Sequence, residues 1–266
     1  MKIELADRSV VVFGAARGIG RAIADGFVSE GCRVVGFDRA APENGDQSAA
    51  EGHGTRSPFP LVVGDVTDAN QVVSFAESVG PVDHVVYCVG IGSGGFGFPS
   101  WNVDASSWPS VLDVNLIGAA RVANALAPGM VERRHGSFLF LTSVAGQIGS
   151  QTDPPYSASK AALINYMQCL AKDLAPAGVR ANALSPGMVK TELNRSVWAW
   201  GQARLPAEER VEYEAWAEAK IRTVSPLGRW QEPAEFASMA IYLASDHARN
   251  ITGQTINIDG GWVMHS

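Results

Sequence analysis

Tyr156 and Lys160 are the residues of this chain whose types and spacing most directly suggest chemistry. They lie four positions apart in a run Tyr-Ser-Ala-Ser-Lys, so on a helix they would project from the same face. The lysine ammonium group would then lie beside the phenol, and a nearby positive charge favours phenolate, which predicts a lowered pKa for Tyr156. Such a phenol can take a proton from an alcohol or return one to a ketone. The pair also occurs by chance in surface helices, so the elements that position it have to be considered.

A glycine-rich turn near the amino terminus supports this interpretation. The β-branched run Val10–Phe13 predicts a buried parallel strand, and the sequence Gly-Ala-Ala-Arg-Gly-Ile-Gly follows it and leads into a helical pattern. A turn of this kind lets backbone amides approach a pyrophosphate, and the helix start adds unpaired N–H groups and the positive end of the dipole. The spacing is Gly-x3-Gly-x-Gly, which differs from the standard dinucleotide fingerprint. The candidate cofactor-binding residues of this turn are Gly14, Arg17, Gly18, Ile19 and Gly20.

The second predicted strand, Val34–Phe37, ends at Asp38. An acidic residue about 20 positions beyond the glycines can hydrogen-bond the ribose hydroxyls of the adenosine. The same carboxylate repels a 2′-phosphate, which favours NAD over NADP. Arg17 and Arg39 argue for NADP, because either could reach a phosphate. Asp38 carries more weight because a strand end fixes its direction, and NAD is the expected cofactor.

Composition and charge exclude several classes of protein. The chain has 266 residues, of which 46% are hydrophobic, enough to bury a single core, and its net charge is −6. This charge gives no reason to expect nucleic-acid or membrane-surface binding. Cys32, Cys88 and Cys169 form no CxxC pair and are odd in number, which argues against a disulfide framework. No signal-peptide pattern and no uncharged apolar stretch of membrane-spanning length is present, so a cytoplasmic protein without a metal site is expected.

Strand-like and helix-like segments alternate along the chain, which predicts an α/β fold with a parallel sheet covered on both faces. The segment between residues 40 and 60 is rich in Gly, Pro, Ser and Glu and predicts an exposed connection. The expected strands are Val10–Phe13, Val34–Phe37, Leu61–Val63, Val85–Cys88, Phe138–Leu141, Ala181–Leu184 and Thr255–Ile258. The expected helices are Gly18–Glu30, Asn70–Ser78, Trp108–Ala127, Tyr156–Leu174 and Pro233–Ala244.

The glycine-rich turn, Asn115, Ser143, Tyr156 and Lys160 occur in this order, and together they resemble a short-chain dehydrogenase/reductase. The resemblance spans nearly the whole chain, from Val10 to Gly261. It implies a Rossmann-like, doubly wound, seven-stranded parallel sheet in a single domain of residues 1–266. It also implies hydride transfer between a nicotinamide cofactor and a secondary alcohol or ketone.

The same resemblance assigns catalytic roles. Tyr156 would be the general base in oxidation and the general acid in reduction. Lys160 would lower the pKa of the phenol and hydrogen-bond the nicotinamide ribose. The Ser143 hydroxyl would bind the reacting oxygen, and Asn115 would link Lys160 to solvent through water.

The chain departs from the usual sequence of this family at two places. Where the family usually has Asn-Asn-Ala-Gly after the fourth strand, this chain has Tyr-Cys-Val-Gly at residues 87–90, and Phe13 replaces the usual threonine. The first departure puts the bracing of the sheet by that asparagine in doubt.

The resemblance also implies an assembly and further cofactor contacts. The last strand commonly packs across a subunit interface in this family, so a homotetramer is expected, with a dimer next. The remaining cofactor contacts implied are Asp65, Val66, Gly90, Tyr156, Lys160, Pro186, Gly187, Val189 and Thr191.

Residues 192–224 are the least regular segment and mix tryptophans with many charges. The pattern predicts a helix over Glu208–Arg222. Similar enzymes carry their substrate lid here, and that interpretation is favoured over a surface insertion whose tryptophans pack on the body.

The substrate is a small-molecule alcohol or ketone, for which the sequence favours a sugar or polyol. Polar residues that could bind several hydroxyls are Gln147, Ser150, Gln151, Thr152 and Asp153, and aromatic faces are offered by Phe96, Phe98, Trp198 and Trp200. An NADP-linked 3-oxoacyl-thioester reductase is an alternative, favoured by Arg17 and Arg39. A non-catalytic cofactor-sensing or binding protein is a second alternative, against which the intact set of Ser143, Tyr156 and Lys160 argues.

Overall fold

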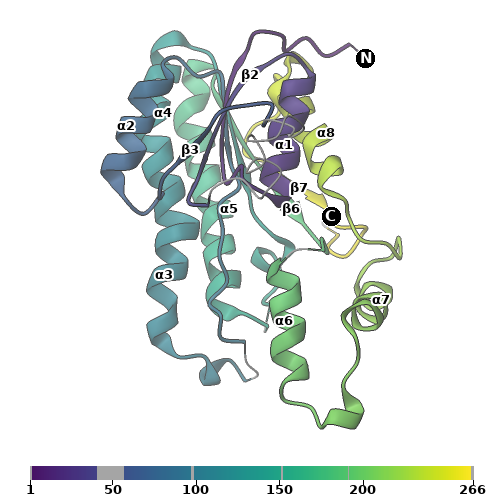
Figure 1. The fold of residues 1–266 in the computed structure, drawn as a ribbon. Coiled ribbons are helices and arrows are strands. Elements are labelled where there is room, and N and C mark those ends of the chain that lie inside the picture. The colour runs from purple at the N-terminus through teal and green to yellow at the C-terminus, as the bar shows by residue number, and fades with distance from the viewer. Residues whose placement is uncertain (1, 41–56, 97–98, 151, 191, 265–266) are drawn as a thin grey trace, which may run out of the picture.

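The computed structural model describes residues 2–40, 57–96, 99–150, 152–190 and 192–264. Within these ranges seven parallel strands form one sheet in the order β3-β2-β1-β4-β5-β6-β7, with helices on both faces (Figure 1). The strands are β1 (Ser9–Phe13), β2 (Arg33–Asp38), β3 (Leu61–Val63), β4 (His84–Tyr87), β5 (Ser137–Leu141), β6 (Arg180–Pro186) and β7 (Thr255–Ile258). The predicted Rossmann-like, doubly wound parallel sheet is confirmed. The strand order reverses between β1 and β4, the kind of position at which open α/β sheets bind ligands.

The central strands are apolar because helices cover both of their faces. Val11 and Val85 pack on the face that carries α2, α4 and α5, whereas Val10 and Val86 pack on the face that carries α1 and α8. Figure 1 shows α1 and α8 together on one face, and α2, α4 and α5 on the other. These helices are α1 (Gly18–Ser29), α2 (Ala69–Val79), α4 (Gly118–Arg133), α5 (Pro154–Leu174) and α8 (Pro233–Ala244).

The prediction of one regular helix over Trp108–Ala127 is wrong in two respects. A short α3 (Trp108–Leu112) passes through a π-helical segment, Asp113–Ile117, before α4 continues to Arg133. The proline inside α4, Pro128, is exposed, as is Asn124 four residues earlier. The carbonyl that loses its N–H partner there can bond to water, so the helix does not stop.

The helical run Ala105–Arg133 is long and apolar enough to cross a membrane by length and composition alone. Its buried side chains include Val111, Val122 and Met130, and the last two belong to the core cluster beneath the sheet. This packing is that of a core helix in an α/β fold.

Residues 192–224 form two helices rather than the single one predicted over Glu208–Arg222. α6 (Glu192–Gln202) was not predicted, and α7 (Tyr213–Val224) begins after a 3-10 turn, Ala207–Glu209. Figure 1 shows both helices on one side of the molecule, away from α2 and α3. The Trp198 indole donates to the Val211 carbonyl at 3.0 Å, and this contact joins α6 to the segment before α7.

The predicted exposed connection lies mostly outside the described residues, which resume at Ser57. Its described end is not exposed throughout, because Phe59 is buried in the core on the α1 face. The guanidinium of Arg21 lies 5.1 Å from the centre of the Phe59 ring. An aromatic side chain in a polar stretch therefore anchors this part of the connection.

Candidate active site

The first turn of α5 holds Tyr156 at the carboxyl end of the sheet. Pro154 opens the helix, and the Asp153 carboxylate caps it by accepting from the Tyr156 N–H at 3.3 Å. The other oxygen of Asp153 accepts from the Ser93 N–H at 2.8 Å, which ties the segment after β4 to the helix start. Proline at the first position and an aspartate cap are strong helix-start signals. The backbone of Tyr156 is therefore fixed from two sides.

Ser143 follows β5 with an extended backbone, and its hydroxyl accepts from the Ala145 N–H at 3.1 Å. This bond caps a short 3-10 turn, the ordinary role of a serine at a strand end. The Ser143 hydroxyl also hydrogen-bonds Tyr156. Ser143 thus serves as a local cap and as a neighbour of the phenol at once.

The prediction that the pKa of Tyr156 is lowered is wrong for the protein described here. Desolvation by burial raises it to about 12, while the hydrogen bond with Ser143 lowers it and the charge of Asp153 raises it further. Lys160 does not reverse this, because its ammonium lies 5.6 Å from the centre of the Tyr156 ring and donates to the Leu141 carbonyl at 2.8 Å. The phenol is therefore protonated at neutral pH.

Lys160 is buried, with 2% of its surface exposed. Burial lowers the pKa of its ammonium to about 8, since a charge is costly away from water. Its neighbours include Gly90 and Asn115. A Cβ added at Gly90 would lie 3.0 Å from the Lys160 Nζ and 3.7 Å from the Asn115 Oδ1. Gly90, Lys160 and Asn115, three residues far apart in the sequence, therefore converge.

Asn115 lies in the π-helical segment and is fully buried. Its Oδ1 accepts from the Ile91 N–H at 2.8 Å, and its Nδ2 donates to the Ile91 carbonyl at 3.0 Å and the Ser159 hydroxyl at 2.9 Å. The side chain is thus a brace between the segment after β4 and α5. The water link to Lys160 implied by the resemblance stays a prediction.

The glycine-rich turn between β1 and α1 has the features that a pyrophosphate needs. Gly14 has φ +85° and packs against the end of β4, where an added Cβ would lie 3.0 Å from the Cys88 carbonyl carbon. Gly18, at the start of α1, has open space where a Cβ would be. No side chain caps the helix start, so its first N–H groups are not used by a cap. Arg17 is exposed beside this turn, whereas the Ile19 side chain is buried and leaves its backbone as the part that can face a ligand.

Asp38 ends β2 and reaches the same turn. One carboxylate oxygen accepts from the Ala16 N–H at 2.9 Å and the other from the Ala40 N–H at 3.0 Å. Its carboxylate therefore adds negative charge beside the turn, where it would oppose a 2′-phosphate.

Asp65 and Val66, the two predicted cofactor contacts after β3, lie in different surroundings. The Asp65 carboxylate accepts from the N–H and hydroxyl of Thr67, and these bonds, the backbone one first, lower its pKa. The Val66 side chain is buried in the core and leaves only its backbone for a ligand.

The turn after β6 is braced by residues that the sequence did not single out. Gln231 accepts from the Met188 N–H at 2.6 Å and donates its own N–H to the Met188 carbonyl at 2.9 Å. A Cβ added at Gly187 would lie 2.7 Å from the Asp259 Cα. Pro186 ends β6 and Val189 is buried, whereas Thr191 lies outside the described residues. No sequence pattern marks Gln231, because its partner is 43 residues away.

Two of the polar residues predicted to bind substrate hydroxyls are already engaged. Gln147 and Asn257 exchange reciprocal amide hydrogen bonds of 2.7 and 3.0 Å. Both oxygens of Asp153 accept from backbone N–H groups, as described above. The prediction that these side chains bind substrate hydroxyls is therefore corrected for Gln147 and Asp153, whose polar atoms are used within the protein. Gln151 lies outside the described residues.

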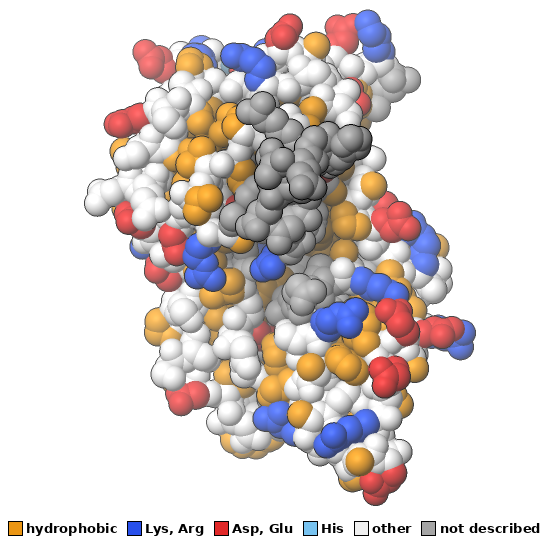
Figure 2. Space-filling model, viewed as in Figure 1, with side chains coloured by type: hydrophobic (Ala, Val, Ile, Leu, Met, Phe, Trp, Pro, Cys, Tyr) orange, Lys and Arg blue, Asp and Glu red, His pale blue; other side chains and the backbone are white. Residues whose placement is uncertain are grey.

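The aromatic residues predicted to border the substrate lie in different surroundings from one another. Phe96, which is buried in the segment after β4, contacts Trp200 of α6 edge to face, with the two ring centres 5.9 Å apart. This contact packs α6 against the segment after β4. Trp198 packs instead against Tyr213, and Phe98 lies outside the described residues. In Figure 2 the lobe containing α6 and α7 shows hydrophobic side chains interspersed with charged ones.

Among the described residues no group of three His, Cys, Asp or Glu side chains is placed to hold a metal ion.

Comparison with known proteins agrees with this geometry. A family model described as enoyl-(acyl carrier protein) reductase matches residues 14–263. The chain belongs to the short-chain dehydrogenase/reductase family. As a short-chain dehydrogenase/reductase it is an oxidoreductase, and the family binds a nicotinamide cofactor.

Individual relatives of this short-chain dehydrogenase/reductase match it over nearly its whole length. The 3-oxoacyl-(acyl-carrier-protein) reductase FabG of Thermotoga maritima is 32% identical over 266 residues, 98% of this chain and 100% of the relative. The 2-(S)-hydroxypropyl-CoM dehydrogenase 3 of Xanthobacter autotrophicus is 31% identical over 264 residues, 98% of this chain and 98% of the relative. The ligand-free structure of Thermoplasma acidophilum aldohexose dehydrogenase is 28% identical, with a TM-score of 0.82 over 100% of this chain and 98% of that one.

Proposed function

We propose that the protein is an NAD-dependent oxidoreductase that interconverts a secondary alcohol and a ketone, with Ser143, Tyr156, Lys160 and Asn115 as its catalytic set. The observation that carries this proposal is the convergence of a serine hydroxyl, a protonated phenol and a buried ammonium at the carboxyl end of the sheet. A bound nicotinamide would supply or accept the hydride. The glycine-rich turn, Asp38, Asp65 and the backbones of Val66, Gly90 and residues 186–191 would hold the cofactor.

In ketone reduction, the Ser143 hydroxyl would orient the substrate oxygen and the Tyr156 phenol would protonate it. A phenol with a pKa of about 12 is fully protonated at neutral pH and ready to donate. In alcohol oxidation, the same phenol must first ionise, so the oxidation rate should rise with pH. Nearby positive charge from Lys160 and from an oxidised cofactor would help, because both stabilise the phenolate.

The proposed preference for NAD rests on the position of Asp38. Initial rates with NADH and NADPH test it directly. We expect at least tenfold higher kcat/KM with NADH in the unmodified protein, and loss of most of that preference in Asp38→Ser. A higher kcat/KM with NADPH in the unmodified protein would overturn the NAD assignment and favour the role of Arg17 and Arg39.

For the substrate, we propose a sugar or polyol. The similarity to an aldohexose dehydrogenase supports this class, and the partly exposed ring of Trp200 on α6 is an aromatic surface that a sugar ring could contact. A 3-oxoacyl thioester is the second candidate. It is supported by the names of several similar relatives and by the internal bonds of Gln147 and Asp153, which leave fewer side chains for sugar hydroxyls. Rates on a panel of sugars, polyols and 3-oxoacyl thioesters decide between them, and turnover of the thioesters alone would reject the sugar assignment.

We further propose that residues 192–224 act as a substrate lid on a single-domain chain. A cytoplasmic homotetramer is the assembly expected by family resemblance, and the three free cysteines fit a reducing compartment. Analytical ultracentrifugation tests the tetramer. A non-catalytic cofactor-binding protein remains the alternative if the panel yields no turnover while NADH still binds.

A further inference from the structure

The π-helical segment between α3 and α4 leaves one backbone carbonyl without its usual helical partner. The N–H of Gly118 donates to the Asp113 carbonyl, five residues back, instead of to Val114, four residues back. A π segment of this kind is rare and has to be stabilised by its surroundings. The carbonyl of Val114 therefore has to find another donor.

Tyr87, at the end of β4, provides that donor. Its hydroxyl donates to the Val114 carbonyl at 2.5 Å, and the side chain is fully buried, with 0% of its surface exposed. Burial raises the pKa of this phenol, so it keeps its proton over the whole working range of pH. A buried hydroxyl that lost this acceptor would have no water to bond, which makes the contact costly to break.

Gly118 makes the approach of the phenol possible. A Cβ added at Gly118 would lie 2.5 Å from the Tyr87 hydroxyl oxygen and 2.9 Å from the Val66 Cγ2. Any larger residue would push the phenol away from Val114. Tyr87 and Gly118 are thus complementary in shape, and Tyr87 stands where the family usually has an asparagine.

The π segment also carries Asn115, the residue after Val114. Returning the segment to regular α-helix would rotate Asn115 by about 100° relative to α4, because each residue turns an α-helix by that angle. Its amide would then leave Ile91 and Ser159, its present partners. Ile91 follows Gly90, which lies against the Lys160 ammonium.

We propose that Tyr87 and Gly118 form a lock that maintains the π segment and thereby positions Asn115 beside Lys160. Tyr87 is a positioning residue, since it would act on the site through the π segment and Asn115. The catalytic half of this inference rests on the proposed function, whereas the structural half does not.

The test is the variant Tyr87→Phe, which keeps the ring and removes only the hydroxyl. We expect amide hydrogen exchange in residues 113–118 to accelerate at least tenfold. With the best substrate of the panel, we expect kcat to fall about tenfold, the KM for NADH to change less than twofold, and the pH profile of kcat to shift. Tyr166→Phe is the matched control, because it removes a hydroxyl from a partly buried tyrosine of α5 that also packs on the core. The control should leave amide exchange in residues 113–118, kcat, the KM for NADH and the pH profile of kcat unchanged.

A second variant keeps the test informative if Tyr87→Phe folds poorly. Gly118→Ala should accelerate exchange in the same segment, and combining it with Tyr87→Phe should add little, because both changes break one contact. Fully additive effects on exchange would overturn the lock.

The remaining outcomes are distinct. Unchanged exchange in Tyr87→Phe overturns the lock itself. Accelerated exchange with unchanged kcat and pH profile overturns the positioning of the site. Absence of any turnover by the unmodified protein refutes the proposed function and the catalytic half of this inference, and the exchange data then decide the structural half alone.

Discussion

The two ends of the central strands both bury ionisable side chains, and only the carboxyl end brings two of them together with a serine hydroxyl. Lys160 and Tyr156 lie beyond the carboxyl ends, and His84 opens β4 at the opposite end. Burial is the largest cause of the pKa shift of all three, and it lowers the pKa of His84 to about 3. A shifted pKa alone would therefore mark both ends as functional.

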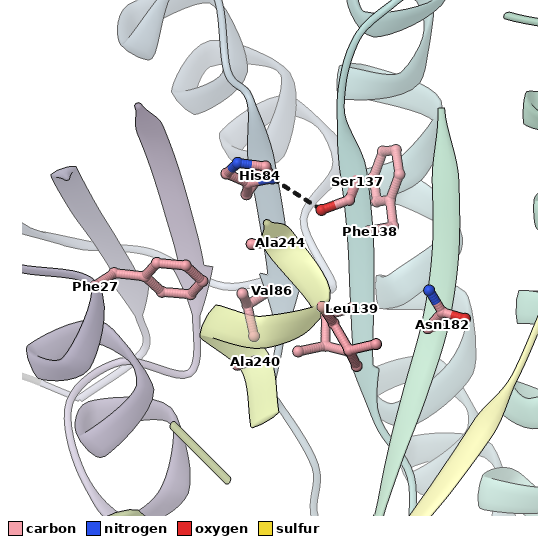
Figure 3. A pocket seen from close by; sticks show the side chains of 10 residues that line it. Phe27, His84, Val86, Ser137, Phe138, Leu139, Asn182, Ala240 and Ala244 are labelled. Carbon is pink, nitrogen blue, oxygen red and sulfur yellow. Dashed lines mark hydrogen bonds between the residues drawn. The ribbon is translucent and has the colours of Figure 1, made fainter. Parts of the chain in front are cut away.

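The surroundings of His84 differ from those of Lys160. Its Nδ1 meets the Ser137 hydroxyl at 2.9 Å, and its Nε2 has no hydrogen-bond partner among the described residues. Figure 3 shows His84 beside a small cavity whose other lining side chains are mostly apolar, including Phe27, Val86 and Leu139. At the carboxyl end, by contrast, the shifted groups lie together with a serine hydroxyl and near an uncapped helix start. Convergence of several groups, rather than burial of one, distinguishes the site.

The largest effect is expected at the carboxyl end. Tyr156→Phe removes the proposed proton donor, and kcat/KM should fall by about 10³-fold, within the range for loss of a general acid. NADH binding, followed by fluorescence titration, should change less than threefold, and the free energy of unfolding should change little. A kcat/KM within tenfold of the unmodified protein would remove Tyr156 from the mechanism.

Ser143→Ala should have the next largest effect. Loss of the proposed donor to the reacting oxygen should lower kcat by about 100-fold, as for a single oxyanion-hole group. The Kd for NADH should stay the same, because the hydroxyl is assigned to the substrate. A change in the cofactor Kd larger than the change in kcat would show that Ser143 acts mainly as the cap of its turn.

At the amino end, His84→Asn should change stability with pH and leave activity unchanged. The unfolded chain binds a proton at His84 near pH 6.5 and the folded chain only near pH 3, so acidification through this window favours unfolding. The free energy of unfolding of the unmodified protein should therefore fall by about 3 kcal/mol more than that of the variant between pH 7 and pH 4. Urea titrations at several pH values measure this difference. Parallel pH curves for both proteins would contradict it, and His135→Asn is a control because His135 is more exposed.

The smallest effect is expected for an exposed ion pair. Lys190 and Glu214 join the turn after β6 to α7 at 2.6 Å, with side chains 47% and 71% exposed. Glu214→Gln should lower the free energy of unfolding by less than about 1 kcal/mol, because water and salt screen the pair. A larger loss, or a severalfold rise in substrate KM, would show that this contact holds α7 in place for function.

The sequence determined the sheet and the identity of the residues at its carboxyl edge. Apolar β-branched runs such as Val10–Phe13 specify central parallel strands, because every residue of such a strand is buried. Tyr156 and Lys160 were found because their spacing is local to one helix. The bounds of α5 and α1 followed for the same reason, within a few residues.

The tertiary structure alone decided the features that depend on distant partners. These are the π segment bonded to Tyr87, the brace from Gln231, the pairing of Gln147 with Asn257, and the raised pKa of Tyr156. Each arises between residues tens of positions apart, or from burial by several elements at once. Local sequence patterns specify which elements form, whereas hydrogen-bond partners and desolvation are set only when those elements pack.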